Sequence, residues 1–188
     1  GTVFGHVNHV IIHNAIIKNY QKEKEQRPVD FLGVNDLLID HLEVYSMPES
    51  SGVSINVSGP RPFSNKITIL DLFVNNAGNA IQICNADSVI INARIHNWTK
   101  NAVYFIYKEG TLISNGTINI TAYTDLDMET APERFFMFNN RVKNISISGN
   151  LEKTNLKKSL TSIPIYISND ITHLDVNVSK LVFTGYSK

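Results

Sequence analysis

The chain has 188 residues, and its 17 lysine and arginine residues balance its 17 aspartate and glutamate residues. This zero net charge argues against a nucleic-acid-binding domain, because such domains carry a basic excess that pairs with phosphates. Hydrophobic residues make up 43% of the chain, which excludes a disordered polymer. No apolar run is long enough for a membrane helix, and the single cysteine, Cys84, excludes a disulfide framework.

Three residue types dominate the composition: 23 isoleucines, 15 valines and 22 asparagines. Isoleucine and valine favour extended backbone, whereas asparagine tolerates the left-handed conformation that tight turns require. Together they predict an all-β protein of short strands joined by Asn-rich turns.

One unit recurs at intervals of 22–34 residues: an alternating apolar run, one or two small or polar residues, and a second alternating apolar run. It is clearest at 10–17, 37–44 and 67–74. Looser copies begin near Val89, Thr111, Ile145 and Leu174. A further short strand precedes most copies, so each repeat is expected to contain three strands, which we name A, B and C in chain order.

Strands B and C are separated by too few residues for an ordinary hairpin, and both keep their apolar residues on one face through the bend. The expected bend residues are Asn14, His41, Asp71, Asn92, Asn115 with Gly116, Gly149 with Asn150, and Asn177. These residue types are enriched at positive φ.

This pattern predicts a parallel β-helix in which each repeat is one rung and equivalent strands stack about 4.8 Å apart. Stacking is required because one rung cannot bury its apolar face alone. An antiparallel sandwich is the alternative, but it favours Asn-Gly or Asp-Gly hairpin turns between strands. The one such dipeptide, Asn115-Gly116, falls at an expected bend.

Short strands, Asn-rich bends and long connections between strand C and the next strand A resemble the single-stranded right-handed β-helix proteins. Pectate lyases, polygalacturonases and phage tailspikes belong to this group. The resemblance covers nearly the whole chain and implies a right-handed parallel β-helix of about seven rungs, each with three short strands. We expect residues 1–188 to form a single β-helix domain. Because neither end has an evident cap, we expect this domain to be a fragment of a longer chain, or else a subunit whose ends partners cover.

The chain lacks the polygalacturonase motifs and the calcium-binding carboxylate cluster of pectate lyases. Its irregular repeat and its composition rich in Asn, Ile and Ser look most like a phage tailspike or appendage protein. That resemblance implies a homotrimer that binds, and often cleaves, a host cell-surface polysaccharide, located in the virion tail or outside the cell. From the residues themselves we expect no cofactor, no metal, no nucleic-acid partner and no membrane. Alternatives are a polysaccharide hydrolase or lyase of the pectate-lyase-like class and a non-catalytic adhesin segment.

Two groups of acidic residues are candidates for catalysis, because paired carboxylates support glycoside hydrolysis. The first is the acidic segment with Asp125, Asp127, Glu129 and Glu133. The alternative for this segment is a solvated loop without a catalytic role. The second is the bends, where His13 and Asp40, and likewise His41 and Asp71, occupy equivalent sites on neighbouring rungs. There Asp71 is the catalytic candidate, and the alternative is a purely conformational role.

Outward positions of strand A are the expected substrate-binding surface, since rings pack on sugar C–H faces and amides bind hydroxyls. The candidates are Asn56, Gln82, Tyr104, Tyr107, Phe136 and Tyr166, with Trp98 in the preceding loop. The alternative is that some of these rings point inward.

Apolar residues are also expected at outward positions of strands B and C, where a second copy or a flanking loop would cover them. They are Ile11, Ile16, Leu38, Leu70, Phe73, Ile90 and Ile95.

Overall fold

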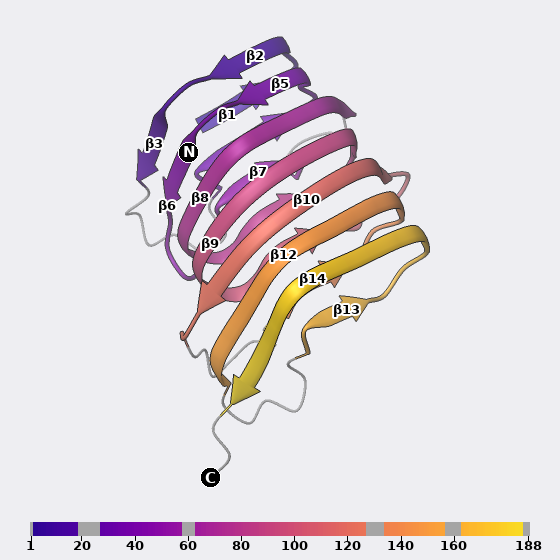
Figure 1. The fold of residues 1–188 in the computed structure, drawn as a ribbon. Helices are drawn as coiled ribbons and strands as arrows, with labels where there is room; N and C mark the ends of the chain where they lie inside the picture. Colours follow the sequence, from indigo (N-terminus) through magenta and orange to yellow (C-terminus); the bar gives the residue numbers. More distant parts are fainter. Residues whose placement is uncertain (1, 19–26, 58–62, 127–133, 157–162, 186–188) are drawn as a thin grey trace.

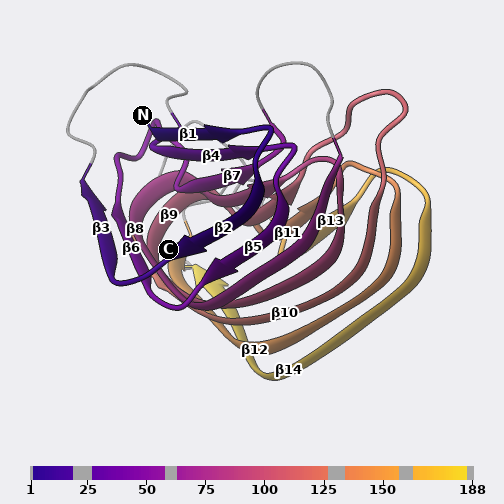
Figure 2. The same cartoon turned by 90° about the horizontal axis from the view of Figure 1, so that it is seen from above.

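The computed structural model describes residues 2–18, 27–57, 63–126, 134–156 and 163–185. They form a β-helix in which every strand pairing is parallel (Figure 1). The chain turns clockwise as it recedes from the viewer in Figure 2, so the coil is right-handed. The predicted all-β, right-handed parallel β-helix is confirmed, with about six turns instead of seven, since the seven stacked levels of strand are separated by six turns. No helix capable of crossing a membrane occurs in these residues.

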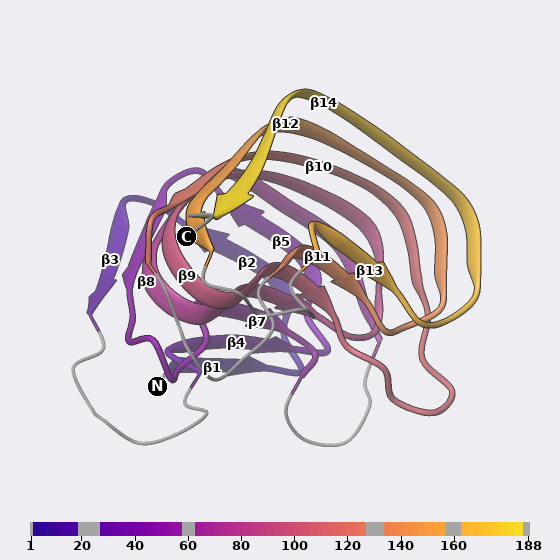
Figure 3. The same cartoon turned by 90° about the horizontal axis from the view of Figure 1, so that it is seen from below.

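Each turn has three sides, which we call the A, B and C faces after the strands that form them (Figures 2 and 3). The separate strands of the A face are β1 (Thr2–Gly5), β4 (Val29–Leu32), β7 (Val53–Ile55), β11 (Arg134–Phe138) and β13 (Ile165–Ile167). In the first two turns the B face holds β2 (Asn8–Ile12) and β5 (Asn35–Ile39), and the C face holds β3 (Ala15–Lys18) and β6 (Leu42–Tyr45).

Later turns use long strands that bend through the corners without a break. These are β8 (Ser64–Ile83), β9 (Ala86–Phe105), β10 (Ile113–Thr124), β12 (Val142–Leu156) and β14 (Ile171–Gly185). The C-terminal ends of β8 and β9 also lie on the A face, because Ile81 of β8 pairs with Val53 of β7 and with Val103 of β9, one turn on.

The core consists of columns of equivalent apolar residues stacked along the axis. One column on the B face is isoleucine at five successive levels, all at most 1% exposed: Ile39, Ile69, Ile91, Ile118 and Ile147. On the A face the rings of Phe105 and Phe138 stack 4.5 Å apart and nearly parallel. Alternation of inward and outward residues along each strand generates these columns.

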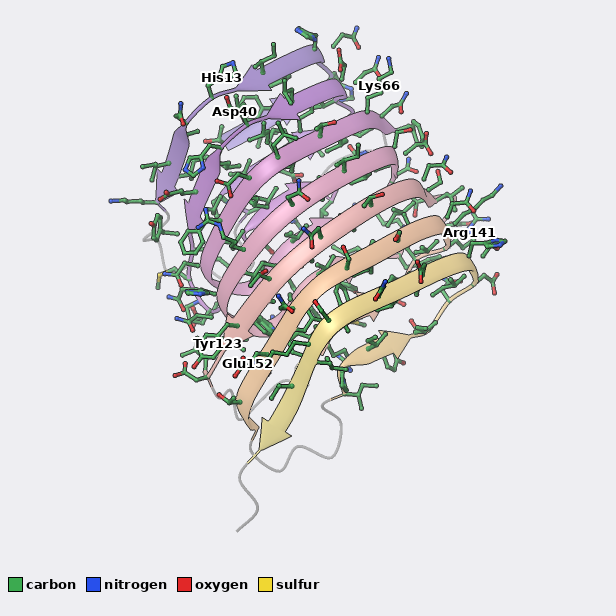
Figure 4. The ribbon with its side chains drawn as sticks, in the orientation of Figure 1. His13, Asp40, Lys66, Tyr123, Arg141 and Glu152 are labelled. Atoms are coloured by element: carbon green, nitrogen blue, oxygen red, sulfur yellow. The ribbon has the colours of Figure 1, made fainter. Side chains whose placement is uncertain are left out.

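The corner between the A and B faces has a left-handed residue at every level, with φ between 52° and 68°. The seven residues are His9, Asp36, Lys66, Ser88, Asn115, Asn144 and His173. Figure 4 shows Lys66 at this edge of the helix. Side chains also join levels here: the Asn144 amide donates to Asn115, and the Asn115 amide donates to Asp87.

The corner between the B and C faces differs from the prediction in two ways. Asn115 and Gly116 do not form it, because Ile118 pairs with Ile91 and Ile120 with Ala93, which places Asn119 at that corner. Positive φ is also rare there: within the described residues only Asn14 and Gly149 adopt it. The other residues turn the chain with ordinary strand conformations.

The column of isoleucines generates a stability prediction with a matched control. Ile91→Ala should lower the free energy of unfolding by about 2–5 kcal/mol, because it leaves a cavity in a closely packed column. Ile90→Ala should cost about 1 kcal/mol or less, since Ile90 points outward and is 47% exposed. Denaturant unfolding of both variants measures the difference, and equal losses would contradict the assigned alternation.

Candidate functional site

A groove of about 430 Å³ lies on the outer side of the A face, and we call it the A-face groove. Its walls come from several turns of the helix. Asn79 and Gln82 belong to β8, Lys100 and Tyr104 belong to β9, and Met137 belongs to β11. Because these strands stack in register, the groove extends across neighbouring rungs rather than along one strand.

Hydrogen bonds between rungs hold the polar side chains of this face. The Asn101 amide donates to Asn79 Oδ1 at 2.7 Å, and Asn79 and Asn101 are register partners. The Ser54 hydroxyl donates to Gln82 Oε1 at 3.1 Å. These bonds fix the amides before any ligand arrives, which lowers the entropic cost of binding.

Three cationic side chains line the A-face groove: Arg27, Lys100 and Lys108. They come from separate segments, since Arg27 precedes β4, Lys100 lies in β9 and Lys108 follows β9. Glu49 is the single carboxylate among the groove residues that the structure describes. The groove therefore has a positive excess in a chain of zero net charge.

Two buried polar atoms of groove residues have no hydrogen-bond partner within the described part of the chain: Asn101 Oδ1 and Arg27 Nε. Asn101 as a whole is only 5% exposed. A buried acceptor or donor without a partner is costly, so such atoms are rare in folded proteins. Asn101 Oδ1 and Arg27 Nε therefore keep unmet hydrogen-bonding capacity at the wall of the A-face groove.

The predicted binding residues Gln82 and Tyr104 both line the A-face groove. Tyr166 continues the same outward column, because Tyr104 pairs with Met137 and Met137 pairs with Tyr166. The Arg134 guanidinium lies 4.8 Å from the centre of the Tyr166 ring. Figure 3 shows β11 and β13 side by side at this end of the A face.

Three predicted binding residues are core or scaffold instead. Trp98 and Phe136 are fully buried; Trp98 packs 5.3 Å from Phe135, and its indole donates to a backbone carbonyl. Phe136 points inward because the outward position beside it belongs to Met137. Neither ring is open to a sugar. Asn56 is 2% exposed, and its amide accepts from the Gly33 backbone and donates to the Asn85 carbonyl, so it ties neighbouring rungs together.

The remaining candidates do not meet in the groove. Tyr107 follows β9 and is 47% exposed, but it is not a groove residue. Asp125 is exposed just after β10. The other acidic candidates, Asp127 and Glu129, lie outside the described residues, as does Glu133.

The predicted histidine–carboxylate pairs do form, and they link the first three turns of the helix. His13 Nδ1 bonds to Asp40, and His41 Nδ1 lies 2.7 Å from Asp71. A further pair that the sequence pattern did not identify joins His9 to Asp36 at 2.9 Å at the A–B corner. Figure 4 shows His13 and Asp40 on neighbouring turns.

His41 is the centre of the densest group of charged side chains. Its Nε2 lies 3.2 Å from Glu43, which also accepts a 2.8 Å hydrogen bond from the Tyr45 hydroxyl. Asp71 accepts from the Arg94 guanidinium at 3.1 and 3.3 Å. We call these five residues the His41 cluster.

Hydrogen bonds to Asp71 and Glu43 raise the pKa of His41 above its ordinary value. Burial alone would raise the pKa of Asp71, but hydrogen bonds from His41 and Arg94 outweigh it and lower this pKa. The Tyr45 hydroxyl and His41 likewise lower the pKa of Glu43. Each shift widens the pH range over which its group is charged, and both nitrogens of His41 are engaged. This arrangement suits a link between rungs, and none of the five residues lines the A-face groove.

A column of aromatic rings lies along the outer side of the C face. Successive ring centres lie 5.8 Å apart for Tyr45 and Phe73, 5.7 Å for Phe73 and His96, and 6.0 Å for His96 and Tyr123. Each pair meets edge to face, a favourable geometry that covers the rings with one another. Phe73, expected in an exposed stripe, is thus half-buried in this column, and Ile95 of the same stripe is fully buried core.

A second, open groove of about 570 Å³ follows the A–B corner through the later turns. Its wall includes Ser88, Asn115 and Asn144 of the left-handed column, together with the exposed Ile90. It carries no lysine or arginine and thus differs in charge from the A-face groove.

Neither a protein-family model, a curated protein nor a solved structure matches this chain. Any statement on function therefore depends on the fold and on the geometry described above.

The His41 cluster makes stability depend on pH with a definite sign. A histidine with a raised pKa stabilises the fold at low pH, and this contribution is lost as pH rises through the raised pKa. Carboxylates with a lowered pKa stabilise at higher pH and lose their contribution as pH falls through the lowered values. The unfolding temperature should therefore be highest between these limits.

His41→Asn should remove the decline in unfolding temperature above neutral pH, as followed by circular dichroism across a pH series. His6→Asn is the control, since the His6 side chain makes no ion pair or hydrogen bond within the described residues, and only its backbone N–H bonds, to the Leu32 carbonyl. A decline that persists unchanged in His41→Asn would show that the cluster does not link the rungs.

Proposed function

We propose that this β-helix binds an extended polysaccharide, with the chain of sugars lying along the A-face groove. The observation that carries the proposal is the groove itself, in which fixed amides, a tyrosine and cations occur on successive rungs. Rungs repeat every 4.8 Å or so, which is close to the length of one sugar unit in a linear glycan. A linear polymer parallel to the axis can thus place successive units on successive rungs.

The chemistry of the lining supports the same proposal. Gln82 and Asn79 offer amides that suit hydroxyl groups, and Tyr104 offers a half-buried ring beside them. Cross-rung hydrogen bonds hold these groups in place. Recognition by orienting polar groups on a rigid scaffold is characteristic of binding sites. Because Glu49 is the single described carboxylate in the groove, binding without cleavage is the activity that we propose.

A host-attachment role on a phage tail, outside the cell, is the setting we propose for this binding. Trimeric assembly is part of that proposal, because large apolar side chains remain exposed on the outer B and C faces. They are Ile11, Ile16, Leu70 and Ile90, between 46% and 59% exposed. Copies of the chain that cover these residues would remove them from water.

An array of bacterial capsular and O-antigen polysaccharides tests the proposed binding. We expect the protein to retain at least one extended polysaccharide, and Gln82→Ala with Tyr104→Ala to weaken retention by about tenfold or more, the effect of losing one or two direct contacts. Thr117→Ala, on the B face, is the control. Absence of binding to every polysaccharide on the array, by protein shown to be folded, would overturn the proposal.

The same samples distinguish binding from cleavage. Size-exclusion chromatography of the bound polysaccharide, before and after prolonged incubation, should show no shortening. Fragments that accumulate with time would instead support the hydrolase or lyase alternative.

A further inference from the structure

We infer that the A-face groove selects an acidic saccharide unit, with Asn101 as the specificity-determining acceptor and Arg27 and Lys100 as the anion-binding groups. This inference rests on the proposed polysaccharide binding and specifies the class of sugar. Its basis is the combination, in one groove, of unpaired positive charge and an unpartnered buried acceptor.

The first part of the argument concerns charge. Lys100 lines the groove and makes no ion pair or hydrogen bond within the described residues. Arg27 brings a second cation whose buried Nε has no partner there. Lys108 is partly engaged, since its ammonium donates to the Val57 carbonyl. Among the groove residues that the structure describes, Glu49 is the one carboxylate that opposes these cations. An anionic group on the ligand would complete the pairing, and charge-assisted hydrogen bonds are the strong ones.

The second part concerns the buried acceptor. Asn101 uses its amide nitrogen to hold Asn79, which fixes the side chain and leaves Oδ1 without a donor. A fully deprotonated inorganic anion such as sulfate cannot satisfy this oxygen, because it carries no hydrogen-bond donor. An acidic sugar offers both groups: a carboxylate for the cations and a neighbouring hydroxyl for Asn101.

The two requirements together discriminate between sugars. A neutral sugar satisfies Asn101 but leaves Arg27 and Lys100 unpaired in a partly buried groove, where unpaired charge is costly. The groove at the A–B corner, with no lysine or arginine, provides an internal contrast on the same scaffold. Acid preference is therefore a property of the A-face groove and not of the helix surface in general.

To test the inference, uronic-acid polysaccharides are immobilised on the array in pairs, each beside its carboxyl-reduced derivative. The reduced polymer keeps the same backbone and hydroxyls but has no charge. We expect each bound acidic polymer to lose about tenfold or more in affinity upon reduction, the effect of losing a charge-assisted hydrogen bond. Equal affinity for the members of a pair, or tightest binding to a neutral polymer, would overturn the inference while leaving polysaccharide binding intact. Absence of all binding would instead overturn the proposed function.

Variants assign the preference to the named residues. Lys100→Gln should abolish most of the difference between the members of a pair, because it removes one of the free cations of the groove. Lys143→Gln, an exposed lysine of β12 outside the groove, should leave the difference unchanged. An O-methylated form of the bound acidic oligosaccharide should also bind more weakly, since it cannot donate to Asn101. If Lys100→Gln behaves like Lys143→Gln, or if O-methylation has no effect, the assignment is wrong.

Discussion

The structure depends on the in-register, parallel pairing of each turn with its neighbours. A single turn of this chain cannot bury its own apolar residues, so core and backbone hydrogen bonding exist only between turns. Register must then be kept along each face, because a slip of one residue exchanges the inward and outward side chains. A register shift such as that between Ile69 and Leu72 falls at the corner between the B and C faces. The left-handed residue at each A–B corner keeps this register by turning the chain at the same point in every level.

Stacking converts a sequence repeat into columns of side chains, and each column has one environment along its length. Inside, Ile69, Ile91 and Ile118 form part of a dry column. Outside, the same rule places His41 beside Asp71 and Asn79 beside Asn101, each pair contributed by neighbouring turns. The A-face groove and the His41 cluster therefore both result from the stacking of turns. In the His41 cluster the charged side chains pair with one another, whereas in the groove some polar atoms have no partner within the described residues.

Much of the fold could be predicted from the sequence because alternation is a strong local signal. The runs around Leu37 and Ile67 revealed both the strands and the pairing of turns. The corners were harder. At the A–B corner the left-handed residue can be Lys66 or Ser88, and these types carry no conformational signature. At Asn115-Gly116 a turn-like dipeptide suggested the wrong corner, because the stacking of whole turns decided the register and local preference did not.

The site was partly predictable for a related reason. Gln82 and Tyr104 belong to apolar strands, and alternation alone predicted that their side chains lie on the outer side of the A face, where both line the groove. Phe136 was misplaced because the strand is aromatic on both sides, and only the register of Met137 with Tyr104 shows which side faces the solvent. The cations of the groove gave no signal in sequence, since Arg27 and Lys108 lie in connections whose paths only the three-dimensional structure defines.

Disulfide cross-linking between turns tests the central claim most directly. With Cys84 replaced by serine, Thr117→Cys and Ser146→Cys place cysteines at register partners on neighbouring turns. Their Cα atoms should lie about 5 Å apart, within the range that a disulfide spans. Thr117→Cys with Ser148→Cys is two residues out of register, at about 8 Å, and should not close. Rapid oxidation of the first pair alone supports parallel in-register stacking, whereas equal or reversed rates would contradict it.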